Sequence, residues 1–399
     1  MTRRLYFLLA LVLCASLSIF FLLRPSSTEP APAAAAVSAP AVDPALYQGF
    51  ARATGPMELF FPGDHGPHPD YQTEWWYYTG NLLTAEGRHF GYQLTFFRRA
   101  LLPAGAAPER QSDWGTRQAY MAHFALTDSA ANEYHAFERL ERGAAGLAGA
   151  QSEPFRAWLG DWEVSETAPA VYRLHARAAA EDGESLAIDL ELNDVRGPVL
   201  QGDRGYSQKG PDPGQASYYY SLTRLESNGT VTVGGQAYPV SGLSWMDHEF
   251  STSVLSPNQV GWDWLSLQVS LGAEQQPAEL MLFQIRQADG SIDPFSSGTL
   301  VYPDGSTRTL KREDFTIAVT GTWKSPHSGA EYPAGWRISA AEIGLELALT
   351  PVIPDQELNL SYSYWEGAVT IEGTLLGEAA SGRGYVELTG YSGSMSGEF

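Results

Sequence analysis

The sequence predicts an all-β protein whose antiparallel sheets close into barrels or sandwiches. At 186–192 the apolar residues Leu186, Ile188 and Leu190 alternate with other residues, and 265–271 alternates in the same way. A period of two is typical of a strand with one buried face. No stretch of a dozen residues keeps a helical apolar stripe, and 40 glycines and 25 prolines punctuate the apolar segments. Further strands are expected at 90–97, 218–225, 280–285, 345–349, 369–375 and 385–391.

The composition is that of a globular protein with an acidic surface. Of 399 residues, 44% are hydrophobic and 12% aromatic, and 46 Asp and Glu against 25 Lys and Arg leave a net charge of -21. An acidic surface repels phosphate groups, so we expect no nucleic-acid partner. The one cysteine, Cys14, lies in an apolar leader, which excludes disulfides, thiolate nucleophiles and cysteine-based metal sites from the folded part.

The first 24 residues are predicted to direct export. Arg3 and Arg4 precede an uncharged apolar run at 5–23, which Arg24 closes. This run is longer than the ~7 to 15 residues of a signal peptide's apolar region and close to the ~20 of a spanning helix. The protein is therefore expected to be periplasmic, either anchored in the inner membrane by a leader helix or released after signal cleavage. Pro, Ala and Ser dominate the next stretch, so 25–48 is predicted to be a linker.

A repeated theme predicts two related β-domains after the linker. An Asp-His pair at 64–65 is followed by an acid and two tryptophans at 74–76, and an Asp-His pair at 247–248 is followed by a similar group at 262–264. We place the boundary near the turn that Ser227, Asn228 and Gly229 suggest. The two predicted domains are 49–228 and 229–399.

Strong enzymatic signatures are absent from the sequence. It contains no G-x-S-x-G, no G-x-x-x-x-G-K-[ST], no G-x-G-x-x-G after a strand and no H-E-x-x-H. These absences weigh against the common hydrolases, NTPases, dinucleotide enzymes and zinc proteases. His65 and His68 could offer two metal ligands, but the Gly-Pro between them is typical of a polar loop. We therefore expect no metal and no cofactor.

The densest chemical segment is 73–80. On a strand, Glu74, Trp76 and Tyr78 share one face, and the residues between them share the other. Glu74 can then line a cavity whose aromatic side chains bind a ligand, where partial desolvation raises its pKa. The alternative is a core strand in which an arginine or backbone amides satisfy Glu74.

A second segment, 244–250, offers a pair of acids. If it is extended, Trp245, Asp247 and Glu249 share one face and His248 lies on the opposite one. Two residues along a strand span ~7 Å, so Glu249 can raise the pKa of Asp247 and let it hold a proton near neutral pH. General acid chemistry needs such a group. The alternative is a surface turn with solvated acids.

Asp263 poses a similar question. It has the parity of Leu265 and so points to the apolar side of its strand, whereas Trp262 and Trp264 point the other way. A carboxylate that faces a core must be paired, protonated or functional. Asp263 therefore either pairs with an arginine or faces a ligand.

Five motifs, at 68–82, 91–98, 245–250, 280–284 and 364–369, together resemble the AttH family of secreted lipocalin-like proteins. That family includes the carotenoid 1,2-hydratases (CrtC) and is distantly similar to fungal lipocalin-like pericyclases. The resemblance spans most of the chain. It implies two lipocalin-like antiparallel β-barrel domains side by side, with an apolar cavity at or near their junction.

The hydratase pattern pairs His-x-Trp with a later Tyr-x-Asp, whose Asp is the proposed acid/base. The matching positions here are 218–220 and 245–247, where the aspartate is kept and the imidazole is not. The resemblance implies that Tyr218, Tyr220 and Trp245 line the ligand site and that Asp247 transfers protons.

Two functions are compatible with this site. A protonated Asp247 could protonate a trisubstituted alkene, and a water steered by His248 or Glu74 would complete hydration, whereas proton loss would give isomerisation. The protein would then be a cofactor-free hydro-lyase or isomerase acting on an isoprenoid-, polyketide- or lipid-like molecule. The alternative is a non-catalytic carrier of hydrophobic ligands associated with an ABC export system.

Overall fold

The computed structural model describes residues 48–103, 105–106, 112–180, 183–252, 255–256 and 258–395. The predicted leader helix at 1–24 and the predicted linker up to residue 47 lie outside these residues. None of the helices in the described part of the chain has the length and apolar character that a membrane crossing requires.

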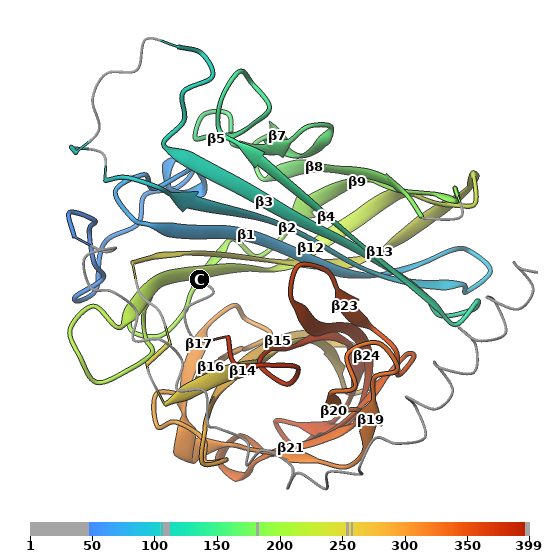
Figure 1. The fold of residues 1–399 in the computed structure, drawn as a ribbon. Helices are drawn as coiled ribbons and strands as arrows, with labels where there is room; N and C mark the ends of the chain where they lie inside the picture. The colour runs from blue at the N-terminus through green and yellow to red at the C-terminus, as the bar shows by residue number, and fades with distance from the viewer. Residues whose placement is uncertain are drawn as a thin grey trace, which may run out of the picture. The chain divides into compact units, whose positions relative to one another are not determined.

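A first antiparallel sheet is built from the earlier part of the described chain (Figure 1). Its strand order is β4-β3-β2-β1-β13-β12-β9-β8-β7-β6-β5, and β10 and β11 pair with β12. Its strands are β1 (Thr73–Leu83), β2 (His89–Ala100), β3 (Gln118–Asp128), β4 (Glu133–Arg142), β5 (Ala148–Gln151), β6 (Arg156–Leu159), β7 (Trp162–Ala168), β8 (Val171–Ala179), β9 (Ser185–Asp194), β10 (Pro198–Leu200), β11 (Tyr206–Gln208), β12 (Ala216–Val233) and β13 (Gln236–Ser251).

A second antiparallel sheet follows, in the order β17-β16-β15-β14-β25-β24-β22-β21-β18, with β23 paired to β24 and a separate pair β19-β20. Its strands and the small pair are β14 (Gln259–Leu271), β15 (Gln276–Gln287), β16 (Ser297–Val301), β17 (Thr307–Lys311), β18 (Thr316–Val319), β19 (Thr322–Lys324), β20 (Glu331–Pro333), β21 (Trp336–Ala340), β22 (Leu345–Pro351), β23 (Glu357–Asn359), β24 (Ser363–Leu375) and β25 (Glu378–Leu388). Short 3-10 helices are η2 (Gly63–His65), η3 (Arg312–Asp314) and η4 (Ala341–Ile343).

The prediction of an all-β protein with two barrel-like antiparallel sheets is confirmed. The described residues contain no α-helix, and every predicted strand falls on an observed one, although β25 ends at Leu388, before the predicted end. The second sheet, yellow to red in Figure 1, curls into a nearly closed barrel, and the first sheet is more open.

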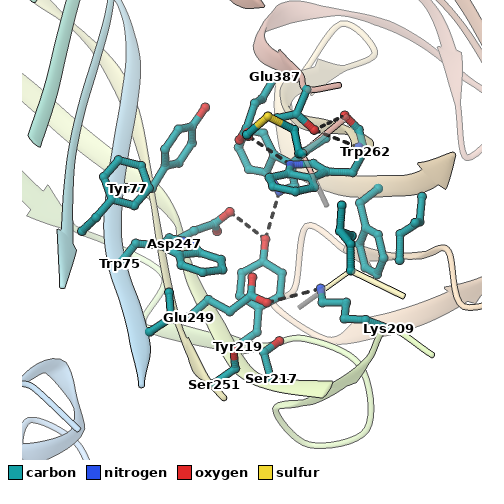
Figure 2. Close-up of a pocket in the computed structure, with 18 of the residues that line it drawn as sticks. Trp75, Tyr77, Lys209, Ser217, Tyr219, Asp247, Glu249, Ser251, Trp262 and Glu387 are labelled. Carbon is teal, nitrogen blue, oxygen red and sulfur yellow. Dashed lines mark hydrogen bonds and ion pairs between the residues drawn. The ribbon is translucent and has the colours of Figure 1, made fainter. Parts of the chain in front are cut away.

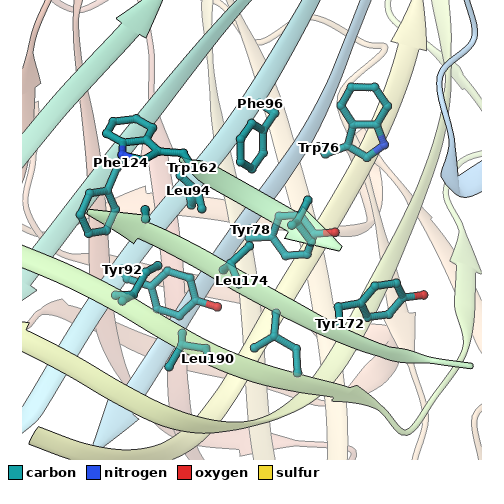
Figure 3. Packing of buried hydrophobic residues seen from close by; sticks show 14 of the residues in the cluster. Trp76, Tyr78, Tyr92, Leu94, Phe96, Phe124, Trp162, Tyr172, Leu174 and Leu190 are labelled. Atoms are coloured by element: carbon teal, nitrogen blue, oxygen red, sulfur yellow. The ribbon is translucent and has the colours of Figure 1, made fainter. Parts of the chain in front are cut away.

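Each sheet encloses a hydrophobic core of its own. Trp76, Tyr78 and Trp162 belong to the first core, which Figure 3 shows from close by. Leu265 and Trp336 belong to the second. Burying one such side chain stabilises the fold by about 1.5–3 kcal/mol, so each sheet has a large apolar driving force for closure. A third cluster, with members from both sheets, includes Tyr77, Tyr219, Trp245 and Trp264.

The chain passes from the first sheet to the second between Ser251 and Gln259, later than the predicted boundary at 228/229. Residues on both sides of that predicted turn belong to β12, which pairs with β13 through a two-residue turn at Gly234 and Gly235. Both glycines have positive φ (58° and 79°), as the tightest hairpin turns require. Gly229 instead allows a close strand approach, because a Cβ there would lie 2.1 Å from the carbonyl oxygen of Asp189.

Polar contacts between the two sheets fix the walls of the space they share. Gln268 of β14 donates to the carbonyl oxygens of Thr223 and Ser244 over 2.8 and 2.9 Å. Glu279 of β15 pairs with Arg224 of β12. These contacts hold β12 and β13 against β14 and β15, which are among the strands that line the site described next.

Candidate functional site

Strands β1 and β13 divide their alternating side chains between two environments. They are antiparallel neighbours, with Tyr77 opposite Asp247 and Trp75 opposite Glu249. These four side chains line a cavity between the sheets, whereas the residues between them face the core of the first sheet. The parity that the sequence predicted for 244–250 is therefore observed, with Asp247 and Glu249 on one face and His248 on the other.

The cavity has a volume of about 150 Å³ and lies between the two sheets (Figure 2). An engineered cavity of about this size binds benzene, so the space accepts a group of one ring without rearrangement. Its first-sheet wall comes from β1, β12 and β13. Its second-sheet wall carries aromatic side chains and acids, among them Trp262, Trp264, Phe283, Tyr364, Glu366 and Glu387.

Asp247 is 4% exposed and accepts three hydrogen bonds on the cavity wall. Tyr219 donates to Oδ2 over 2.6 Å, and Ser221 and the Trp245 indole donate to Oδ1 over 2.5 and 2.7 Å. Burial raises the pKa of Asp247 to about 7, because desolvation outweighs these three hydrogen bonds, which favour the ionised form. Asp247 is thus a carboxyl group that can exchange a proton near neutral pH.

Glu249 is the second acid on this wall, and it has a cationic partner. Its Oε1 lies 3.4 Å from Nζ of Lys209. The same ammonium group lies 4.1 Å from the ring centre of Phe283 in the second sheet. The pair lies beside Asp247, because Glu249 and Asp247 share one face of β13 (Figure 2).

Two further acids, Glu366 and Glu387, face the cavity from the second sheet. They are register partners on β24 and β25. Tyr77 donates to Oε2 of Glu366 over 2.8 Å, and the Trp262 indole donates to Oε1 of Glu387 over 3.0 Å. Burial raises the pKa of Glu387 to about 8 and that of Glu366 well above its usual value, in each case with help from neighbouring carboxylates.

Glu74 does not line the cavity, although the sequence suggested that it could. It is fully buried on the opposite face of β1, where Arg98 lies 2.6 Å from Oε2. His68 and His248 each lie 2.8 Å from Oε1. Burial alone would raise the pKa of Glu74, but Arg98 and the two imidazoles hold it below its usual value. The alternative of a core carboxylate paired with an arginine is therefore the one observed.

His248 also lies away from the cavity. Its Nδ1 is 3.0 Å from the Tyr220 hydroxyl, which in turn is 2.7 Å from Nδ1 of His65. Burial lowers the pKa of His248 and of His65, the latter to about 4, so neutral imidazoles fit this chain of hydrogen bonds. Neither His248 nor Glu74 can steer a water in the cavity, because both point into the first sheet's core.

Trp76, Tyr78, Tyr218 and Tyr220 also lie outside the cavity wall. Trp76, Tyr78 and Tyr220 belong to the first core, and Tyr218 donates to the carbonyl oxygen of Gly55 over 2.9 Å. Tyr219, between the two predicted tyrosines, is the residue that faces the cavity. The resemblance pointed to β12, whose side chains alternate between two faces, and the motif alone does not indicate which face lines the cavity.

Asp263 is paired rather than ligand-facing. Arg286 donates to Oδ1 over 2.9 Å, and Gln284 donates to Oδ2 over 2.9 Å. The flanking tryptophans, Trp262 and Trp264, lie on the opposite face as their parity predicted, and that face, not the face of Asp263, lines the cavity. Trp245 packs in the hydrophobic cluster between the sheets, and its indole donates a hydrogen bond to Asp247.

Four residues of the cavity wall were not among the predicted site residues: Trp75 and Tyr77, which lie on the face of β1 opposite Glu74, and the acids Glu366 and Glu387. A local signal existed for Glu387, an acid between the buried residues Val386 and Leu388 in a predicted strand. Nothing local relates it to Asp247, because the two come from different sheets.

Two groups in the described residues have three possible metal-ligating atoms within 4.8 Å of one another: His68, Glu74 and His248, and Glu133, His135 and Glu184. In the first group the Glu74 carboxylate already binds Arg98, so a metal ion would face a guanidinium. Neither group lies on the wall of the cavity.

Comparison with known proteins places these features in context. The model of the AttH-like protein family matches residues 52–391. The crystal structure of a Nitrosomonas europaea protein described as AttH is 36% identical, with a TM-score of 0.72, and the match covers 86% of this chain and 100% of that one. Kievitone hydratase from Nectria haematococca shares the fold at 15% identity and a TM-score of 0.62, over 86% of this chain and 98% of that one. No curated protein matches the sequence.

Proposed function

The chain belongs to the AttH-like family, and from this premise we propose that it binds an isoprenoid-, polyketide- or lipid-like molecule between its two sheets and catalyses cofactor-free hydration or isomerisation of an alkene. The observation that carries the proposal is the position of Asp247. It lines a largely aromatic cavity, it forms no ion pair with the described residues, and its pKa is raised to about 7. A carboxyl group in this state is suited to protonate a weakly basic substrate.

In the proposed first step, Asp247 transfers its proton to one carbon of a trisubstituted alkene. The π electrons form the new C–H bond, and the other carbon becomes a tertiary carbocation. The faces of nearby rings such as Tyr219 and Trp264 favour that cation by about 1–2 kcal/mol each when water is excluded. The Asp247 carboxylate left behind adds a compensating negative charge.

In the second step a water oxygen bonds to the carbocation. The proton lost from that water passes to the Glu249 carboxylate and then returns to Asp247, so the net reaction adds one water. If no water is present, an adjacent carbon instead loses a proton to Asp247, and the net reaction moves the double bond. Glu249 takes the role that the sequence analysis gave to His248 or Glu74, because it faces the cavity and they do not. The fold is compatible with such chemistry, since kievitone hydratase, a hydratase by name, shares it.

The test uses defined trisubstituted alkenes, farnesol and squalene, incubated with the protein in heavy-oxygen water. Mass spectrometry should detect a product that has gained one labelled water, or a regioisomer of unchanged mass. Asp247→Asn should abolish either product while retaining ligand-induced quenching of tryptophan fluorescence. The control is Asp189→Asn, because Asp189 lies on β9 with its side chain 46% exposed. Full turnover by Asp247→Asn contradicts the assignment.

A second candidate function is carriage of an apolar molecule without chemistry, in association with an ABC export system. The aromatic lining of the cavity supports it equally. Ligand extracted from native protein and identified by mass spectrometry separates the two functions. Cargo that is unchanged after prolonged incubation favours carriage.

We also propose that the protein is exported and acts in the periplasm, either anchored through residues 5–23 or released by cleavage. The basic residues before the apolar run, and its length, support this proposal. Cell fractionation and the intact mass of the native protein test it.

A further inference from the structure

The cavity holds more acids than cations. Four carboxyl groups line it, from Asp247, Glu249, Glu366 and Glu387, and Lys209 is the one basic residue on its described wall. Lys209 pairs with Glu249. Three buried or partly buried acids therefore face an enclosed space without a cationic partner.

Elsewhere the described chain pairs several buried acids with guanidinium groups and satisfies others, such as Glu357, with several hydroxyl donors. Glu74 pairs with Arg98 over 2.6 Å, and Asp263 pairs with Arg286 over 2.9 Å. Such pairing is the usual way to offset the cost of burying a carboxylate. Glu366 and Glu387 have neither a guanidinium partner nor several donors among the described residues, and the pKa of each is raised.

Glu366 and Glu387 show the departure most clearly. They stand directly opposite each other on adjacent strands, where two like charges are unfavourable unless something neutralises them. Each accepts one hydrogen bond from a neutral donor, Tyr77 or Trp262. The second oxygen of each carboxyl group has no hydrogen-bond partner within the described ranges of the chain. Glu366 is only 1% exposed and lines the cavity.

Near Glu249, the same cavity already holds a cation between an acid and an aromatic ring. There the ammonium group of Lys209 lies 3.4 Å from the Glu249 carboxylate and 4.1 Å from the ring centre of Phe283. An ammonium group between a carboxylate and an aromatic face is favourable on both sides. Glu366 with Tyr77, and Glu387 with Trp262, offer the same two kinds of partner without a cation among the described residues. Figure 2 shows Glu387 beside Trp262.

We propose that the ligand of this cavity carries a substituted ammonium group, which Glu366 and Glu387 bind together with the rings of Tyr77 and Trp262. The inference rests on the proposed function in one respect, since it places the ligand in the same cavity. It adds a substrate class: an apolar molecule with one cationic end. The two acids are then binding residues, and Asp247 on the facing wall is left free for chemistry.

The test compares three probes of similar size on the whole protein. Phenyltrimethylammonium carries the cation, tert-butylbenzene is its neutral isostere, and benzenesulfonate carries the opposite charge. Titration followed by tryptophan fluorescence and calorimetry should show that phenyltrimethylammonium binds at least about tenfold more tightly than tert-butylbenzene, as a desolvated cation–aromatic contact beside carboxylates allows. Benzenesulfonate should not bind.

Substitutions of the two acids test whether they cause the preference for the ammonium group. Glu366→Gln and Glu387→Gln should each lower the affinity for phenyltrimethylammonium several-fold and leave that for tert-butylbenzene unchanged. Glu372→Gln is the matched control, because Glu372 lies on β24 with its side chain exposed. If the glutamine variants fail to fold, the comparison of probes on the unaltered protein still decides the matter.

The outcomes separate this inference from the proposed function. Equal or tighter binding of tert-butylbenzene overturns the ammonium preference and leaves an apolar binding site intact. An ammonium preference that survives in the Glu366→Gln, Glu387→Gln double variant overturns the assigned residues. Failure of all three probes to bind overturns the inference, and it removes the support for a ligand site in the cavity as well.

Discussion

The Tyr219 hydroxyl lies 2.6 Å from Oδ2 of Asp247, and the two residues come from adjacent strands of the first sheet. The indole of Trp264, from the second sheet, donates to the same Tyr219 oxygen over 3.0 Å. Tyr219 therefore connects the candidate acid to the opposite wall. The protonation of Asp247 should therefore depend on this hydroxyl group, together with Ser221 and Trp245, and on how closely the two sheets pack.

Tyr219→Phe should raise the pKa of Asp247 further above 7, because the variant loses a hydrogen bond that favours the carboxylate. A hydrogen bond to a charged group contributes about 1.5–3 kcal/mol, which corresponds to roughly one or two pH units. Carbon NMR of labelled aspartate measures the change. Tyr218→Phe is the control, since that hydroxyl bonds Gly55 away from the cavity. An unchanged or lower pKa in Tyr219→Phe contradicts the prediction.

The stability of the protein should fall as the pH rises from 7 to 9. The pKa values of Asp247 and Glu387, about 7 and 8 in the folded protein, exceed those of an unfolded chain, so the folded state binds these protons more tightly. The resulting stabilisation is complete below about pH 4 and is lost through pH 7 to 8. The buried histidines, whose pKa values are lowered, act at lower pH and leave this window unaffected.

Urea denaturation at pH 7 and 9 measures this dependence. Glu387 should account for a loss of about 1 kcal/mol in the free energy of unfolding across that interval. Glu387→Gln should therefore flatten the pH dependence. A free energy of unfolding that stays constant or rises between pH 7 and 9 contradicts the raised pKa values of Glu387 and Asp247.

Arg98→Met should destabilise the protein by about 3–5 kcal/mol, because it leaves the buried carboxylate of Glu74 without its guanidinium partner. Adding Glu74→Met to that variant should recover much of the loss, since it removes the uncompensated charge. Denaturant unfolding of the two single variants and the double variant measures the coupling. A single-variant cost below about 1 kcal/mol contradicts the view that this pair holds the first core together.

Gly229→Ala should destabilise the protein by about 2 kcal/mol or more, for two reasons. The φ of Gly229 is +154°, and a Cβ would meet the carbonyl oxygen of Asp189 at 2.1 Å. Gly55→Ala is the control, because nothing lies within 4 Å of a Cβ placed there. Thermal unfolding measures both variants, and equal melting temperatures would mean that β9 and β12 can separate without cost.

The sequence allowed the strands and their parity to be predicted, because alternation is a local property of the chain. The two faces of 244–250 and of 261–265 were separated correctly on this basis. Parity does not say which face meets a ligand, however, and in β1 both faces are buried. Glu74 was preferred over Tyr77 because an acid among aromatic rings suggested chemistry, but Arg98, on the next strand, neutralises it.

The second wall of the cavity could not be predicted from local patterns. Glu366 and Glu387 are joined to Asp247 only by the way the two sheets meet, and that contact depends on side chains far apart in the sequence. The predicted boundary at 228/229 falls within β12 for a related reason. Ser227, Asn228 and Gly229 have the composition of a turn, but pairing with β9 and β13 keeps them extended.

Strand β13 carries Asp247 and Glu249 on one face and His248 on the other. The number of residues in the strand is therefore constrained. Losing or gaining one residue just before Trp245 would rotate the strand's side chains by half a repeat, directing Met246 and His248 to the ligand and the two acids to the first core. Relatives that keep this cavity should therefore vary in length at the Gly234-Gly235 turn and not within the strand.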